Sequence, residues 1–145
     1  MLAGAVAIVL ARPAAALGQR SDEAVLVRLV AREEAAVEAY ASEPLPGLRA
    51  DEEEHAAALR THLDALGRRP APKGLDPVAR RVAESSGSRQ LEAAIALEAS
   101  LVEAYSAALL DLEAPGVVQT AATILASHAQ HLALLRERAG VDPLA

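Results

Sequence analysis

Residues 32–40 read REEAAVEAY, and residues 97–105 read LEASLVEAY. Both stretches end in Val-Glu-Ala-Tyr, and in both a Glu stands seven residues before the Tyr. A second pair matches more loosely, EEEHAAALR at 52–60 and HAQHLALLR at 128–136. The same order of stretches therefore occurs twice along the chain. This order predicts two related helical hairpins, whose inner polar residues would meet across a pseudo-two-fold axis.

The composition favours helices in one domain. Of the 145 residues, 52% are hydrophobic and 1% aromatic, with Ala and Leu most frequent. Ala and Leu lose little free energy on entering a helix, and a chain of this length suits one continuous core. The net charge of −6 and the lack of a basic cluster argue against nucleic acid as a partner. No cysteine is present, which excludes disulfides and thiolate metal sites.

Turn residues divide the chain into four expected helices, over about 21–42, 48–66, 88–113 and 117–139. Ser21, followed by Asp22 and Glu23, is the expected N-cap of the first. A long connection covers 68–87, with one helical turn expected around 78–84. Short loops join antiparallel neighbours, while one long connection can travel the length of a bundle. The expected fold is all-α, an antiparallel four-helix bundle of two helical hairpins joined by a long crossover.

Each expected helix carries an apolar stripe that repeats in steps of four and three residues, the period of a bundle seam. Near the middle of each stripe, Glu or His stands where packing alone would favour Leu or Val. These inward polar residues are Glu33, Glu52, His55, Glu98, His128 and His131. His62 lies two turns beyond His55 and is expected beside the site or at the surface. The same spacing places Glu34, Glu38, Glu53, Glu54 and Glu103 off the stripes.

Two interpretations of these polar positions compete. A single Glu on a stripe can lie at a helix edge, and a single buried His is usually hydrogen-bonded within the core. Polar groups in the middle of four helices at once are harder to accommodate, because burying carboxylates and imidazoles without partners is costly. A bound cation offsets that cost with its own charge. We therefore expect a metal site, with a purely structural polar layer as the alternative.

The order of Glu and then Glu-x-x-His, repeated once, resembles the ferritin-like superfamily, whose di-iron and di-manganese bundles carry this ligand set. The chain is most similar to exported bacterial ferritin-like domain proteins, because residues 124–131 (ILASHAQH) stand where these read Ile-Leu-Ala-x-Glu-x-x-His. The resemblance covers about residues 21–139. It implies a ferritin-like fold and, as metal ligands, Glu33, Glu52, His55, Glu98 and His131.

Position 128 departs from the family pattern, because His stands where the family has Glu. In relatives that Glu tends to bridge two metal ions, and a neutral imidazole bridges poorly. His128 still forms a competent metal-binding pair with His131 on one helix face. The expected cofactor is a divalent metal. The family implies a di-iron centre, whereas the added imidazole also allows a mononuclear site and Mn, Zn or Cu.

Three functions are compatible with this pattern. The first is a metal-binding protein outside the cytoplasm, in metal handling or an oxidase-like redox role, with Tyr40 and Tyr105 beside the site or in the core. The second is a non-catalytic helical module with a degenerate metal site, which works through a partner or as a homodimer. The third is a membrane-tethered stress protein, if an N-terminal leader stays attached.

The N-terminus suggests export. Residues 1–11 form an apolar run, Arg12 and Pro13 end it, and three Ala residues follow. The run is too short to span a bilayer but has the length of a signal-peptide hydrophobic region. A basic region before it is missing, as though the start lay inside a longer leader, which in relatives often carries a twin-arginine signal.

From these features we expect a leader over 1–20, the bundle over 21–140 and a tail over 141–145. The protein would then be periplasmic or extracellular and would have no stable membrane span. It would be cytoplasmic if the leader interpretation is wrong.

Overall fold

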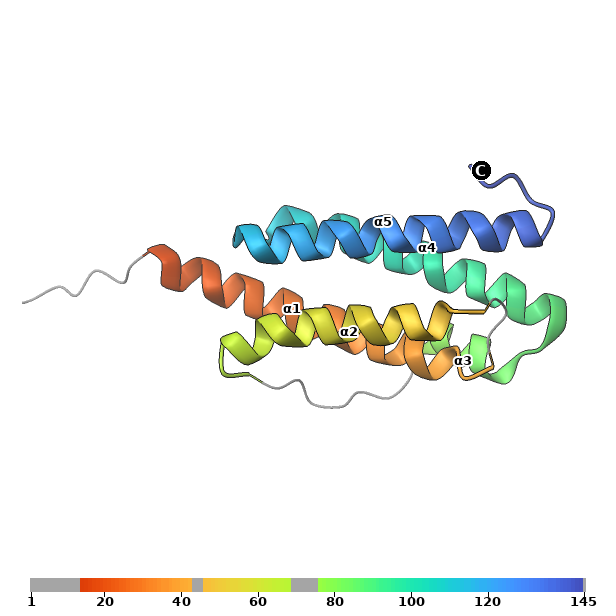
Figure 1. Ribbon diagram of the computed structural model, residues 1–145, viewed down its shortest axis with the longest axis horizontal. Coiled ribbons are helices and arrows are strands. Elements are labelled where there is room, and N and C mark those ends of the chain that lie inside the picture. Colours follow the sequence, from red (N-terminus) through yellow and green to blue (C-terminus); the bar gives the residue numbers. More distant parts are fainter. Residues whose placement is uncertain (1–13, 43–45, 69–75, 145) are drawn as a thin grey trace, which may run out of the picture.

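The computed structural model of the protein describes the backbone of residues 14–42, 46–68 and 76–144, and side chains within these ranges from residue 22 onward. This part of the chain consists of helices and contains no strand (Figure 1). The helices are α1 (Ala14–Ala39), α2 (Leu48–Ala65), α3 (Pro77–Glu84), α4 (Gly87–Asp111) and α5 (Pro115–Arg138). The all-α prediction is confirmed.

The four long helices form two antiparallel hairpins. α1 packs along α2 and α4 packs along α5, while α1 also contacts α4 and α2 contacts α5. Figure 1 shows α2 ending at one end of the bundle, whereas α3 and the start of α4 lie at the other. The end of α2 and the start of α3 therefore lie at opposite ends of the bundle, which agrees with the crossover that the sequence predicts.

Local sequence explains where α3 begins and α2 ends. Asp76 caps α3, because its Oδ1 accepts hydrogen bonds from the backbone N–H groups of Val78 (2.9 Å) and Ala79 (2.8 Å). Pro77 occupies the first helical turn, where its missing N–H does no harm. This helix is the helical turn expected in the long connection. Gly67 follows α2 with a φ of 68°, a left-handed conformation that favours Gly.

The start of α1 differs from the expectation. The helix begins at Ala14 instead of Ser21, since the intervening residues are rich in Ala, the best helix former. Asp22 therefore does not take part in an N-cap. Its buried carboxylate instead accepts hydrogen bonds from the backbone N–H groups of Glu113 (2.8 Å) and Ala114 (2.9 Å), just before α5. Through these two hydrogen bonds, Asp22 holds the connection between α4 and α5 against α1.

Two apolar layers fill the bundle. The first consists of Val25, Leu26, Leu29, Val30, Leu59, Leu63, Tyr105, Ala108, Leu112, Val117, Ala121 and Ile124. The second consists of Ala35, Ala36, Ala39, Tyr40, Leu48, Ala79, Val82, Ala94, Leu97, Leu101 and Leu135. Between them lie polar residues from all four long helices that have no exposed surface, Glu33, Glu52, Glu98 and His128. The centre of the bundle is therefore polar and is enclosed by apolar side chains on both sides.

α4 is the one helix in the described part of the chain that is long and apolar enough to cross a membrane. In the bundle it packs against α1, α3 and α5, and it carries the fully buried Glu98. Core helices of bundles can have the same composition. The absence of a stable membrane span stays a prediction.

Candidate metal centre

The six polar residues expected on the inner stripes meet at the centre of the bundle. α1 and α4 each supply one Glu, α2 supplies a Glu and a His, and α5 supplies two His. These are Glu33, Glu98, Glu52, His55, His128 and His131. His55 and His131 keep 12% and 8% of their side chains exposed, so the cluster reaches solvent at this edge.

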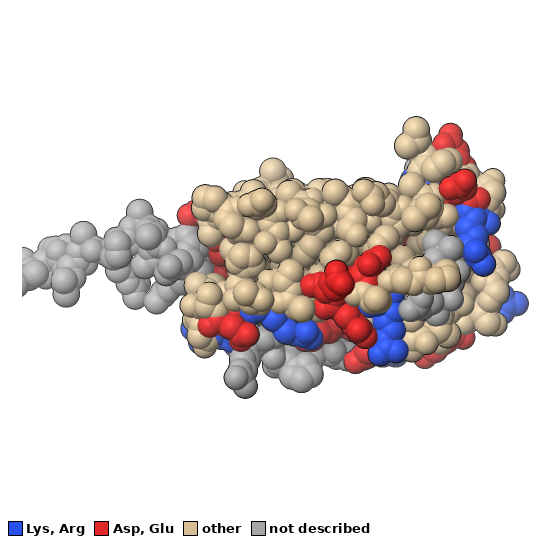
Figure 2. Space-filling view, viewed as in Figure 1, with Lys and Arg blue, Asp and Glu red and all other residues tan. Residues whose placement is uncertain are grey.

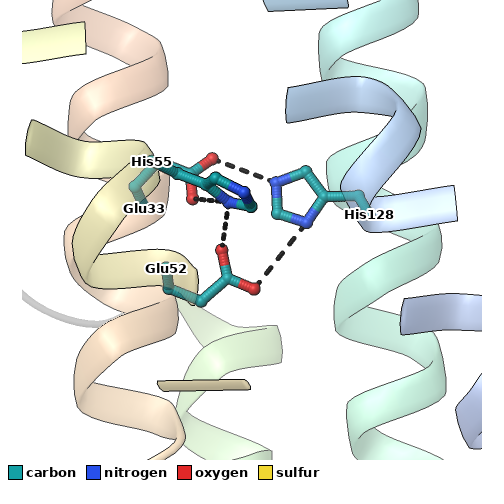
Figure 3. A group of neighbouring side chains, drawn as sticks. All are labelled: Glu33, Glu52, His55 and His128. Atoms are coloured by element: carbon teal, nitrogen blue, oxygen red, sulfur yellow. Dashed lines mark hydrogen bonds and ion pairs between the residues drawn. The ribbon is translucent and has the colours of Figure 1, made fainter. Parts of the chain in front are cut away.

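Four of these residues form a closed ring of contacts in which carboxylates and imidazoles alternate (Figure 3). Nδ1 of His55 lies 3.6 Å from Oε2 of Glu33 and 3.0 Å from Oε2 of Glu52. His128 closes the ring from α5. Its Nε2 lies 3.2 Å from Oε1 of Glu33, and its Nδ1 lies 3.8 Å from Oε1 of Glu52. The two nitrogens of one imidazole thus face two different carboxylates.

Glu98 and His131 extend the ring on the side of α4 and α5. Oε2 of Glu98 lies 2.9 Å from Nδ1 of His128 and 3.6 Å from Nδ1 of His131. Nδ1 of His131 also lies 3.4 Å from Oε1 of Glu52. Glu52 and His128 are therefore shared between two groups of four residues. In each group, four possible ligand atoms lie within 4.8 Å of one another.

The cluster contains buried atoms that need a further partner. Among the described residues, Oε2 of Glu33, Oε1 of Glu52 and Nδ1 of His131 are buried without a hydrogen-bond partner. A buried polar atom left in this way costs about 1–3 kcal/mol. Divalent cations offer buried atoms of this kind a partner, and carboxylate oxygens with imidazole nitrogens form a competent donor set. The residues present therefore fit a metal ion.

The carboxylates raise the pKa values of the three imidazoles. Burial disfavours the charged ring and by itself lowers each pKa, but close contacts with the neighbouring Glu carboxylates and their negative charges outweigh this effect. The pKa rises to about 9 for His55 and to about 10 for His128 and His131. In the metal-free cluster the imidazoles are therefore cations that balance the carboxylates.

The three carboxylates respond differently to these surroundings. Burial raises the pKa of each, yet hydrogen bonds from neighbouring imidazoles, His128 first, hold the pKa values of Glu33 and Glu98 below the ordinary value. For Glu52 the effect of burial prevails, and its pKa is raised. Because metal ligands must be deprotonated, a bound cation would favour the charged form of Glu52.

Two tyrosines connect the carboxylates across the helices. Tyr40, the residue that follows α1, donates a hydrogen bond to Oε1 of Glu98 on α4 (2.5 Å). Tyr105 on α4 donates one to Oε1 of Glu33 on α1 (2.5 Å). Both tyrosine side chains are fully buried, as the stripe pattern predicts. Each bond holds one oxygen of its carboxylate, so that the other oxygen faces an imidazole.

One residue at the site was not expected from the sequence. Oδ2 of Asp51 lies 3.1 Å from Nε2 of His131, the ring nitrogen opposite the one that faces Glu52. A signal was present in the sequence, because Asp51 stands four residues before His55 and so shares its face of α2. Asp51 is half exposed and forms the outer edge of the cluster.

The remaining acidic and His residues lie outside the cluster, as expected. Nε2 of His62 lies 2.9 Å from the hydroxyl of Thr120. Glu34 forms a salt bridge with Arg60 of α2 at 2.7 Å. The other Glu residues predicted off the stripes are exposed, namely Glu38, Glu53, Glu54 and Glu103. Figure 2 shows charged side chains gathered over α2, whereas the face over α5 has few.

Two helical hairpins joined by a crossover, with Glu and His from all four long helices at the centre, define a bundle of the ferritin-like class. The model of the ferritin-like domain family matches residues 12–140, and the chain belongs to this family. No curated protein and no solved structure matches the chain. The expected superfamily is confirmed, whereas the closer similarity to exported bacterial members stays a prediction.

Proposed function

We propose that the protein binds a divalent metal ion at the Glu/His cluster and serves metal handling or a redox reaction. The observation that carries this proposal is the set of three buried atoms without hydrogen-bond partners, Oε2 of Glu33, Oε1 of Glu52 and Nδ1 of His131. They come from three helices and lie between two apolar layers. A cation offers atoms of this kind a partner that the protein does not supply.

The surrounding residues prepare the cluster for a cation. The apolar layers exclude water, and the low dielectric constant strengthens the attraction between carboxylates and a positive ion. Tyr40 and Tyr105 hold Glu98 and Glu33 in place through hydrogen bonds. The slight exposure of His131 marks the edge where an ion can enter. A bound ion would supply Lewis acidity and, if it is Fe, Mn or Cu, electron transfer.

A specific observation favours a second candidate function, a helical module without a metal. His128 has one ring nitrogen toward Glu98 (2.9 Å) and the other toward Glu33 (3.2 Å), so its protonated ring can donate to both. Three imidazolium groups balance three carboxylates without a cation. In this case the chain would act through a partner protein or as a homodimer.

Elemental analysis distinguishes the two functions. The parent protein would be purified without a His tag, beside the double variant Glu52→Gln/His131→Gln and the control His62→Gln, which changes a His outside the cluster. Metal binding predicts stoichiometric Fe, Mn, Zn or Cu in the parent and the control and none in the double variant. A metal-free parent whose melting temperature does not respond to added metal ions would contradict metal binding and favour the helical module.

We also propose that the protein is exported. The apolar run over 1–11, its end at Arg12 and Pro13, and the Ala residues that follow support this proposal. The native gene with its upstream sequence would be expressed, the cells fractionated and the N-terminus of the protein sequenced. Export predicts a shortened chain outside the cytoplasm. A full-length cytoplasmic chain would contradict it.

A further inference from the structure

We propose that the cluster is asymmetric and that a single ion binds in one half of it, among Glu52, Glu98, His128 and His131. This inference rests on the metal binding proposed above. It adds which residues bind, how many ions bind and which class of cation they select. Glu33, from the other half, would not bind the ion. It would orient the imidazole of His128, which binds the ion.

Four atoms of this half face one another closely enough to share one cation: Nδ1 of His128, Nδ1 of His131, Oε1 of Glu52 and Oε2 of Glu98. Nδ1 of His128 lies 2.9 Å from Oε2 of Glu98 and 3.8 Å from Oε1 of Glu52. Nδ1 of His131 lies 3.6 Å and 3.4 Å from the same two oxygens. Ligand atoms held tetrahedrally at about 2.0–2.2 Å from a cation stand roughly 3.3–3.6 Å apart. The four nitrogen–oxygen distances of this half are centred on that spacing.

Two of the three buried atoms without a hydrogen-bond partner belong to this half. They are Oε1 of Glu52 and Nδ1 of His131, which lie 3.4 Å apart. A hydrogen bond between nitrogen and oxygen is usually about 2.7–3.2 Å long. Their separation is therefore too long for a good hydrogen bond and suits two ligands of one cation.

In both histidines of this half, Nδ1 faces the proposed ion and Nε2, the outer ring nitrogen, faces a carboxylate. Nε2 of His131 lies 3.1 Å from Oδ2 of Asp51, and Nε2 of His128 lies 3.2 Å from Oε1 of Glu33. An imidazole that donates its outer N–H to a carboxylate is fixed in orientation and keeps the lone pair of its inner nitrogen for a metal. His55, in the other half, turns its Nδ1 toward both Glu33 (3.6 Å) and Glu52 (3.0 Å).

This donor set selects a cation of the zinc type. Zn²⁺ prefers four ligands in a tetrahedron and accepts both imidazole nitrogen and carboxylate oxygen, whereas Mg²⁺ requires six ligands, almost all oxygen. His128 also limits the number of ions. Its Nε2–H group donates a hydrogen bond to Glu33. The neutral ring then has a single lone pair left, on Nδ1, and can bind only one ion.

The test uses the metal-free full chain with two probes, Zn²⁺ for stoichiometry and Co²⁺ for geometry. Equilibrium dialysis should give one ion per chain, and bound Co²⁺ should show the intense visible absorption of a tetrahedral complex. Asp51→Asn should keep this spectrum and weaken the affinity about 10- to 100-fold, because His131 loses its orienting carboxylate. Glu54→Gln, an exposed change on the same helix, should leave the affinity unchanged.

A second comparison tests the asymmetry. His131→Gln should lose the bound ion, whereas His55→Gln should keep one ion per chain, with circular dichroism to check folding. Because Asp51 is half exposed, its variant decides the question even where His131→Gln does not fold. Two ions per chain, equal loss in both His variants, or parental affinity in Asp51→Asn would overturn the asymmetric site alone. A parent that binds neither probe would overturn the proposed function itself.

Discussion

Tyr105 on α4 and Glu33 on α1 are fully buried, and a hydrogen bond of 2.5 Å joins them across the bundle. The matching bond runs in the opposite direction, from Tyr40 at the end of α1 to Glu98 on α4. Each hydroxyl supplies a carboxylate with a partner that water cannot provide at this depth. Several measurable properties of the protein depend on this pair of bonds and on the charges around it.

Tyr105→Phe removes the hydroxyl and keeps the ring. Because Oε1 of the buried Glu33 loses a hydrogen bond and keeps only its contact with Nε2 of His128, the free energy of unfolding should fall by about 1–3 kcal/mol. Urea denaturation of the metal-free protein measures this change. Thr123→Val removes a hydroxyl from the surface and should change the free energy by less than about 0.5 kcal/mol. Equal effects of the two substitutions would mean that the buried bond contributes nothing.

The tyrosines should resist ionisation while the protein stays folded. Burial, followed by the charge of Glu98 for Tyr40 and of Glu33 for Tyr105, raises the pKa of both well above the ordinary value of 10. The chain has two tyrosines in all, so the absorbance of tyrosinate reports on this pair alone. The absorbance should rise only as the protein unfolds, whereas denatured protein should titrate near pH 10. A native titration near pH 10 would argue against the buried bonds.

Because the pKa values of the three imidazoles are raised, the metal-free protein should lose stability at alkaline pH. Their pKa is about 9 to 10 in the folded state, compared with 6.5 for an unperturbed His. A raised pKa in the folded state contributes to the free energy of unfolding. This contribution is fully present below pH 6.5 and is lost as the pH rises through 9 to 10. The lowered pKa values of Glu33 and Glu98 have the opposite sign, so their contribution is lost as the pH falls below about 4.5.

Urea denaturation of chelator-treated protein across this pH range measures both effects. His128→Gln removes one of the three imidazoles and should flatten the alkaline part of the curve. Stability that stays constant from neutral pH to pH 10 would contradict the charged cluster.

Asp22→Ala should loosen the connection between α4 and α5. The substitution leaves the backbone N–H groups of Glu113 and Ala114 without their acceptor, which should cost about 1–3 kcal/mol. Hydrogen exchange at these two amides should become faster, and urea denaturation should show the lower stability. Asp64→Ala, on the exposed face of α2, should affect neither measurement. Unchanged exchange at Glu113 and Ala114 would show that Asp22 does not hold them.

The spacing of apolar residues was enough to predict the bundle and the Glu residues at its centre. Glu33 lies three residues after Val30 and four before Val37, and it is fully buried. Glu34, one residue later, lies nearer the surface and pairs with Arg60. Side chains three and four residues apart share one face of a helix, so the sequence pattern identifies the inward face without any knowledge of the neighbouring helices.

Contacts between helices could not be predicted in this way. Periodicity does not define how far one helix is shifted along another, so it did not show that Tyr105 meets Glu33 or that Asp51 meets His131. The sequence around Ser21 looks like a helix start, but good helix formers before it extend α1. The true partners of Asp22 lie more than 90 residues away in sequence, beyond any local pattern.

The crossed tyrosine bonds make the two hairpins depend on each other. Each hairpin carries a Glu that the tyrosine of the other hairpin binds, so neither hairpin alone supplies the hydroxyl that this carboxylate accepts. These contacts join residues 58 and 72 positions apart, and such contacts form late because a long segment of chain must first be closed. The hairpins should therefore become ordered together. In related sequences, a change at Glu33 should be accompanied by a change at Tyr105, so that the two hairpins evolve as one coupled unit.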